Sequence, residues 1–110
     1  MMKIEAVIHP FKLTEIKAAL HDLDCEEVTI SEVLHDGGSK IQKRVYRGCE
    51  YRADVPKVKV ETLVSAHRVD EVLEMLASAA DGASDSTILV YEVAEAIRIR
   101  NGRRIEVSLS

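Results

Sequence analysis

Aromatic residues are scarce in this sequence: they make up 4% of the 110 residues, and tryptophan is absent. A chain of this length is the size of one small domain with one core. Because so few aromatic side chains are available, that core must be aliphatic, built from Val, Ile, Leu and Ala. Small domains bury a modest fraction of their surface, so the composition is also compatible with self-association.

Cysteines are nearly as scarce. The two present, Cys25 and Cys49, form neither a CxxC pair nor a dense framework, which argues against a disulfide-stabilised scaffold. Cys25 precedes an expected strand and is interpreted as a small, half-buried residue rather than a reactive thiol.

Long apolar runs are missing as well. No segment approaches the roughly 20 apolar residues that a membrane-spanning helix needs. The opening "MMKIEAVIHPF" lacks the extended apolar region of a signal peptide. The net charge of −4 argues against a general affinity for nucleic acids. We therefore expect a soluble, cytoplasmic protein that does not insert into a membrane and does not bind nucleic acid.

The sequence also lacks the residue patterns that are typical of catalytic sites. His9, His21 and His67 are scattered, and no Ser-His-Asp or Cys-His arrangement supports them. An acylphosphatase would need a glycine-rich anion loop with an arginine after the first strand, and "HPFKLTE" (9–15) is not one. The sequence therefore offers no case for an enzyme.

What the chain does contain is a regular succession of strand and helix patterns. Strands are predicted by alternating or β-branched apolar residues at 3–10, 27–34, 56–64 and 87–93. Helices are predicted by apolar spacing at 13–23 and 67–80. The apolar helix faces are expected to consist of Ile16, Leu20, Leu23, Val69, Val72, Leu73 and Leu76. The strand at 87–93 is apolar enough to be expected at the buried centre of its sheet.

This order, β-α-β followed by a long loop and a second β-α-β, predicts an α+β fold. It is the pattern of the ferredoxin-like sandwich, here a single domain over residues 1–110. In the strand 56–64, Lys57, Lys59 and Glu61 are expected on one face of the sheet. Two helices cover only one face of such a sheet, so the other face needs a partner. A symmetric oligomer is the economical solution.

The segment 35–54 stands apart from this pattern. It has no sustained apolar period and is longer than an ordinary connection, so it is expected to be functional or mobile. Its stretch "KRVYRGCEY" (43–51) holds two tyrosines, three cations, a cysteine and a glycine.

Four stretches together resemble the PII signal-transduction family. They are the opening "KIEAVIHPFKLTEIKAAL" (3–20), "YRGCEY" (46–51), "PKVKVE" (56–61) and "IRIRNG" (97–102), and they follow in register over nearly the whole chain. Within the loop signature only Cys49 falls outside the family's usual residues.

The resemblance implies a homotrimer with three clefts between subunits. In the family these clefts bind ATP or ADP, and 2-oxoglutarate together with Mg-ATP. The segment 35–54 corresponds to the family's T-loop, which docks on a membrane transporter or a metabolic enzyme, commonly in nitrogen metabolism. Tyr51 falls at the position that some members modify with a nucleotide, and Arg47 at the position that some insert into a transporter pore. Without such partners they would be an ordinary loop tyrosine and a surface charge.

The resemblance also implies a nucleotide site. The residues assigned to it are Thr29, Gly37, Lys57, Val64, Ser84, Asp85, Ser86, Thr87, Arg98 and Arg100. Two parts depart from the family. At the base of the T-loop, Gly38 and Ser39 replace an arginine and a glutamine, and only Gly37 is kept. In the B-loop (81–87), two glycines and a lysine are missing.

These departures change the expected ligand. Phosphate cradles need glycines, for close backbone approach, and cations, for charge. Lys57, Arg98 and Arg100 still supply three cations, so an adenine nucleotide is expected with ADP or AMP favoured over ATP. Because the glutamine is replaced, standard 2-oxoglutarate sensing is not expected. If the alignment with the family is set aside, Arg98 and Arg100 are interpreted as solvated residues on one face of the C-terminal segment, 94–110.

A metal site is the remaining option. His35, Asp36, Cys49 and Glu50 are ligand types near the ends of the loop, but no pair has a recognised ligand spacing. The alternatives are therefore a PII-like sensor of another effector, such as AMP with bicarbonate or a metal ion, controlling a transporter outside nitrogen metabolism, or a trimeric metal-tolerance protein of similar fold.

Overall fold

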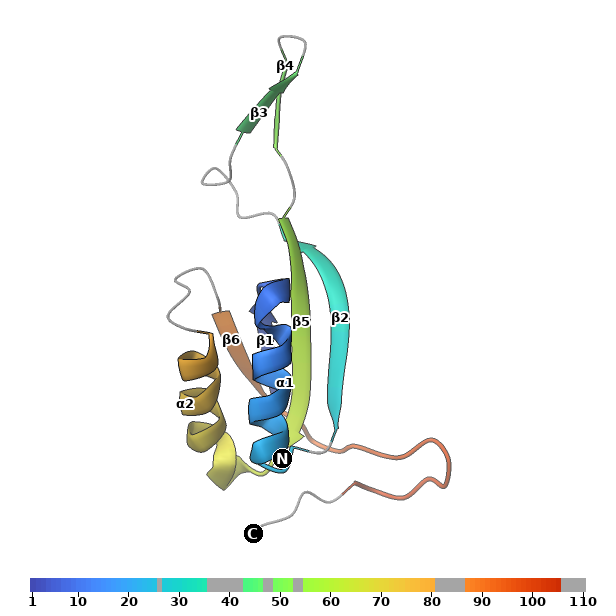
Figure 1. The fold of residues 1–110 in the computed structure, drawn as a ribbon. Helices are drawn as coiled ribbons and strands as arrows, with labels where there is room; N and C mark the ends of the chain where they lie inside the picture. The colour runs from blue at the N-terminus through green and yellow to red at the C-terminus, as the bar shows by residue number, and fades with distance from the viewer. Residues whose placement is uncertain (26, 36–42, 47–48, 53–54, 81–86, 106–110) are drawn as a thin grey trace.

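A computed structural model describes residues 1–25, 27–35, 43–46, 49–52, 55–80 and 87–105, with the backbone alone described in 43–46 and 49–52. Strands β1 (Met2–Ile8), β2 (Val28–His35), β5 (Val55–Val64) and β6 (Thr87–Glu92) form one antiparallel sheet in the order β2-β5-β1-β6. Helices α1 (Leu13–Asp22) and α2 (Val69–Ala79) lie side by side on one face of the sheet (Figure 1). This is the predicted ferredoxin-like arrangement.

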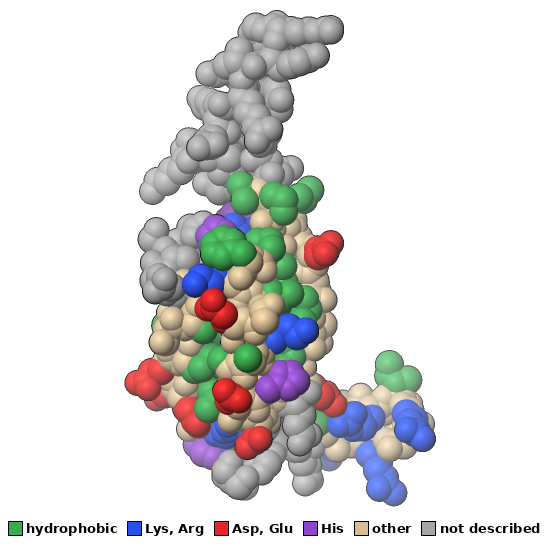
Figure 2. All heavy atoms as spheres, viewed as in Figure 1, with side chains coloured by type: hydrophobic (Ala, Val, Ile, Leu, Met, Phe, Trp, Pro, Cys, Tyr) green, Lys and Arg blue, Asp and Glu red, His purple; other side chains and the backbone are tan. Residues whose placement is uncertain are grey.

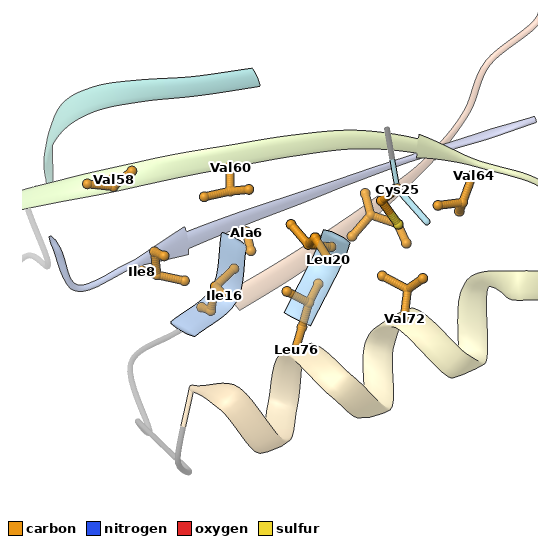
Figure 3. Close-up of a cluster of buried hydrophobic side chains, with 11 residues drawn as sticks. Ala6, Ile8, Ile16, Leu20, Cys25, Val58, Val60, Val64, Val72 and Leu76 are labelled. Carbon is orange, nitrogen blue, oxygen red and sulfur yellow. The ribbon is translucent and has the colours of Figure 1, made fainter. Parts of the chain in front are cut away.

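The core lies between the helices and the sheet (Figure 3). It is aliphatic, as the scarcity of aromatic residues predicted, and consists of Ile4, Ala6, Ile8, Ile16, Leu20, Cys25, Val58, Val60, Val64, Val72 and Leu76. Alternate residues of β1 and β5 point into it because successive side chains of a strand face opposite sides. Full burial of each larger aliphatic side chain contributes about 1.5–3 kcal/mol, so this layer holds the fold together.

A tight turn after α1 places Cys25 in this core. Asp24 adopts a left-handed backbone conformation with φ of 59°, and the amide of Cys25 donates to the carbonyl of Leu20 at 3.0 Å. This is a common way to satisfy the last carbonyls of a helix, and aspartate tolerates the conformation better than most residues. The prediction that Cys25 is half-buried was wrong, because only 3% of the residue is exposed.

The position predicted for the last strand was wrong. β6 lies at the edge of the sheet, and β1 lies between it and β5. Leu89, Val90 and Tyr91 are all exposed. The apolar run therefore does not mark a central strand; in a single chain it leaves apolar surface uncovered at the edge.

The segment 35–54 holds more regular structure than its sequence suggested. Strands β3 (Lys43–Tyr46) and β4 (Cys49–Arg52) pair as an antiparallel hairpin, and Figure 1 shows it beyond the end of β2 and β5. The first residue of segment 35–54, His35, belongs to β2. Val45, Tyr46 and Tyr51 are strand-favouring residue types, which agrees with a hairpin although no apolar alternation announces one.

A narrow C-terminal hairpin extends from the other end of the body (Figure 1). Ile97 and Arg104 are bridged across it, and the amide of Gly102 donates to the carbonyl of Arg98 at 2.8 Å. Gly102 has a φ of +67°, a conformation that favours glycine. We call residues 96–105 the arginine hairpin, because it carries Arg98, Arg100, Arg103 and Arg104. Among the described helices, none is long and apolar enough to cross a membrane.

Candidate effector-binding site

Lys57 lies at the end of the sheet from which segment 35–54 leaves. Its side chain faces away from the helices, as the alternation of β5 predicted, yet it is only 3% exposed. Its Nζ lies 3.5 Å from Nε2 of His9, which follows β1, and the His9 ring stacks on Phe11 with centroids 5.3 Å apart. The ammonium is therefore held in a defined place at the base of the loop.

Thr87 lies toward the same end of the sheet. It is the first residue of β6, pairs with Val7 of β1, and is exposed. The assigned residues Gly37, Ser84, Asp85 and Ser86 would adjoin this end in sequence, and they lie outside the described residues.

A second group lies toward the opposite end. Thr29 is exposed on β2, directly across from Glu61 of β5. Arg98 and Arg100 are exposed on the arginine hairpin. Val64 ends β5, but its side chain belongs to the core, so it can offer a ligand only its backbone.

One chain therefore does not bring the assigned residues together. Lys57 and Val64 sit near opposite ends of β5, about 23 Å apart at roughly 3.3 Å per residue. An adenine nucleotide cannot touch both ends of that strand at once. A single site containing both groups requires the loop end of one chain to meet the hairpin end of another.

The arginine hairpin gives the second group a strong positive charge. Figure 2 shows basic side chains, coloured blue, gathered on this projection, and in this segment they are all arginines. Arg104 pairs with Glu95 at 2.9 Å, and Arg98 pairs with Glu27 at 2.8 Å. The second pair was not predicted from the sequence, because its partners are 71 residues apart and no spacing rule connects them.

Cys25 has no part in this arrangement. It is buried near the hydroxyl of Thr62 and the guanidinium of Arg68, and burial raises the pKa of its thiol, an effect that Arg68 partly opposes. A thiol held protonated in this way is a poor nucleophile. The structure thus agrees with its interpretation as an unreactive packing residue.

For most of the residues predicted to contact a partner or to bind a metal, the structure describes no side chain. Arg47 and Asp36 lie outside the described residues, and Tyr51, Cys49 and Glu50 are placed only by the backbone of β4. Among the metal candidates His35 alone has a described side chain, exposed at the end of β2. Within the part of the chain whose side chains are described, no three His, Cys, Asp or Glu residues come together as a metal site.

Comparison with known proteins identifies the family to which a chain with this fold and these site residues belongs. The family model described as nitrogen regulatory protein P-II matches residues 1–103. A protein named nitrogen regulatory protein P-II from Rhodospirillum rubrum is 43% identical over 107 residues, covering 94% of this chain and 96% of that protein. Proteins of the same name from Pasteurella multocida and Haemophilus influenzae are 40% and 42% identical, each over 96% of this chain and 97% of the relative.

The chain belongs to the PII family of nitrogen regulatory proteins. Members of this family are signal-transduction proteins that regulate other proteins and are not enzymes. This agrees with the absence of a catalytic pattern in the sequence. The resemblance inferred from the four stretches is thereby confirmed, and with it a PII-like regulatory role.

Proposed function

We propose that this protein is a homotrimeric regulator that binds an adenine nucleotide in the clefts between subunits. The nucleotide biases segment 35–54 between conformations, and that segment docks on a membrane transporter or a metabolic enzyme in the control of nitrogen metabolism. Such a ligand moves the loop only by its different affinity for the two conformations. Arg47 and Tyr51 are its proposed contact or modification points.

One observation carries this proposal: the assigned ligand residues that the structure describes fall into two groups toward opposite ends of one sheet. Among the described residues each group alone is incomplete, since the loop end offers Lys57 and Thr87 while the hairpin end offers Thr29, Arg98 and Arg100. A cleft between two subunits joins them without any change of fold.

Calorimetric titration with AMP, ADP and ATP, with and without Mg²⁺, tests the binding. Heat with ADP or AMP is expected, and Arg98→Ala and Arg100→Ala should each weaken binding about tenfold or more, since a charge-assisted hydrogen bond is worth roughly 1.5–3 kcal/mol. The absence of heat with every nucleotide would overturn the proposal. A titration with 2-oxoglutarate belongs in the same series and is expected to show no binding.

Mixed trimers test whether the site lies between chains. Lys57→Met and Arg98→Ala homotrimers should both bind weakly, because every cleft lacks one cation. When the two variants are unfolded together and refolded, some clefts join a native Lys57 to a native Arg98, so part of the binding should return. A site within one chain would show no recovery.

The alternatives make different predictions in the same experiments. A sensor of AMP with bicarbonate would bind AMP more tightly when bicarbonate is present. A metal-tolerance protein would bind a divalent metal ion and show no response to nucleotides. His35→Ala, an exposed position at the end of β2, would weaken metal binding if His35 is a ligand.

A further inference from the structure

Arg98, one of the two arginines that we assign to the phosphates, already has an anionic partner. Nη2 of Arg98 lies 2.8 Å from Oε1 of Glu27, within hydrogen-bonding distance. The side chains of both residues are about half exposed, so a ligand can reach the pair. The inference below rests on the proposed nucleotide site.

Backbone contacts hold both partners in place. The amide of Arg98 donates to the carbonyl of Arg103 at 2.8 Å, which closes the arginine hairpin around it. Glu27 comes directly before β2, and its carbonyl accepts a hydrogen bond from the hydroxyl of Thr62 at 2.9 Å. Because both backbones are held, the Glu27 carboxylate and the Arg98 guanidinium remain within reach of each other.

The carboxylate does not block the arginine. A guanidinium has five N–H donors, and Glu27 contacts one of its nitrogens, so others can still meet a phosphate. What Glu27 changes is the charge that the phosphate meets. Arg98 and Arg100 together would present two positive charges, and the adjacent carboxylate reduces this to one.

The geometry points to Glu27 as a residue that determines specificity, setting how many phosphates the site accepts. A fixed negative charge near the phosphates repels a ligand in proportion to the ligand's own charge. ATP carries roughly two more negative charges than AMP, since each further phosphate adds about one. Glu27 thus disfavours ATP most and AMP least, independently of the glycines missing from the B-loop.

Glu27→Gln tests this directly, because it keeps the side-chain shape and removes the charge. Affinity should rise by about threefold for AMP and by about tenfold for ATP, and the difference should shrink at high salt. Glu95→Gln is the matched control. Glu95 pairs with Arg104 on the same hairpin at 2.9 Å and is 51% exposed against 52% for Glu27, but neither residue is assigned to the nucleotide.

The outcomes separate this inference from the proposed function. If the native protein binds nucleotides and Glu27→Gln changes the affinity for AMP and ATP equally, or weakens both, Glu27 only positions Arg98 and the inference fails. An equal gain in nucleotide affinity in Glu95→Gln would show that only the net charge of the protein matters, and this would also overturn the inference. If neither the native protein nor Glu27→Gln binds any nucleotide, the proposed function itself fails.

Discussion

Glu5 of β1 lies directly opposite Glu61 of β5, and the ammonium of Lys59 contacts both carboxylates, at 3.9 Å and 3.7 Å. Two further side chains complete the group. Lys3 pairs with Glu61 at 3.3 Å and lies over the ring of Tyr91, whose hydroxyl donates to Glu5 at 3.2 Å. The uncovered face of the sheet therefore carries one connected charge network across β5, β1 and β6.

Lys59→Met should lower the free energy of unfolding by about 1 kcal/mol, because it leaves two carboxylates facing each other across neighbouring strands. Urea denaturation at one fixed protein concentration measures this. Adding Glu5→Gln to Lys59→Met removes the repulsion, so the double variant should regain much of the loss. A double variant less stable than Lys59→Met would show that the repulsion is not the cause.

Leu20→Ala should cost about 3–4 kcal/mol, because it leaves a cavity between α1 and the sheet. Leu34→Ala makes the same chemical change at the end of β2 and should cost less than about 0.5 kcal/mol. The two side chains are 0% and 70% exposed, which explains the contrast. Equal losses in thermal or chemical unfolding would contradict the placement of the core.

Stability should fall in alkaline solution partly through Cys25. Burial raises the pKa of its thiol in the folded state above the ordinary 9.0, so the folded chain holds this proton more tightly than the unfolded chain. The resulting stabilisation is complete below the unfolded pKa and is lost as the pH rises from about 9 through the folded pKa. Between pH 7 and pH 10 under reducing conditions, Cys25→Ala should therefore lose less stability than the native protein. Parallel losses in the two proteins would refute this role.

Arg68→Met should destabilise the fold by about 2 kcal/mol. The guanidinium of Arg68 donates to the carbonyl of Leu23 after α1 and lies near Glu71 of α2, so it ties the ends of both helices together. Arg104→Met removes an exposed ion pair to Glu95 and should change stability by less than about 0.5 kcal/mol. Urea denaturation compares the two variants. Similar denaturation midpoints would contradict the proposed role of Arg68 in joining the ends of the two helices.

The parts of the fold that could be predicted from the sequence are those that periodicity encodes. Ile16 and Leu20 recur at helical spacing and are both buried in α1, and the alternation in 56–64 predicted which residues of β5 face the helices. Edge positions were not encoded in this way. Apolar residues of β6 resemble those of a central strand, and only the pairing of β1 shows that β6 is at the edge.

The candidate site was less predictable, because its chemistry depends on pairs that are distant in sequence. Alternation predicted the face on which Lys57 lies but not its burial beside His9, 48 residues away. The family register selected Arg98, yet nothing in the sequence indicated that Glu27 lies next to it. The same register assigned Val64, whose side chain packs into the core instead.

The pairing of β1 with both β5 and β6 has a consequence for how the chain is made. In chain order β1 comes before the other described strands of the sheet, yet it takes an inner position, and the residues that pair with it begin only at Val58 in β5 and Thr87 in β6. Contacts this distant must wait for loop closure, which slows folding. β1 and β2 are not neighbours in the sheet, so during synthesis β1 stays without its partners in this sheet until β5 and then β6 have been made.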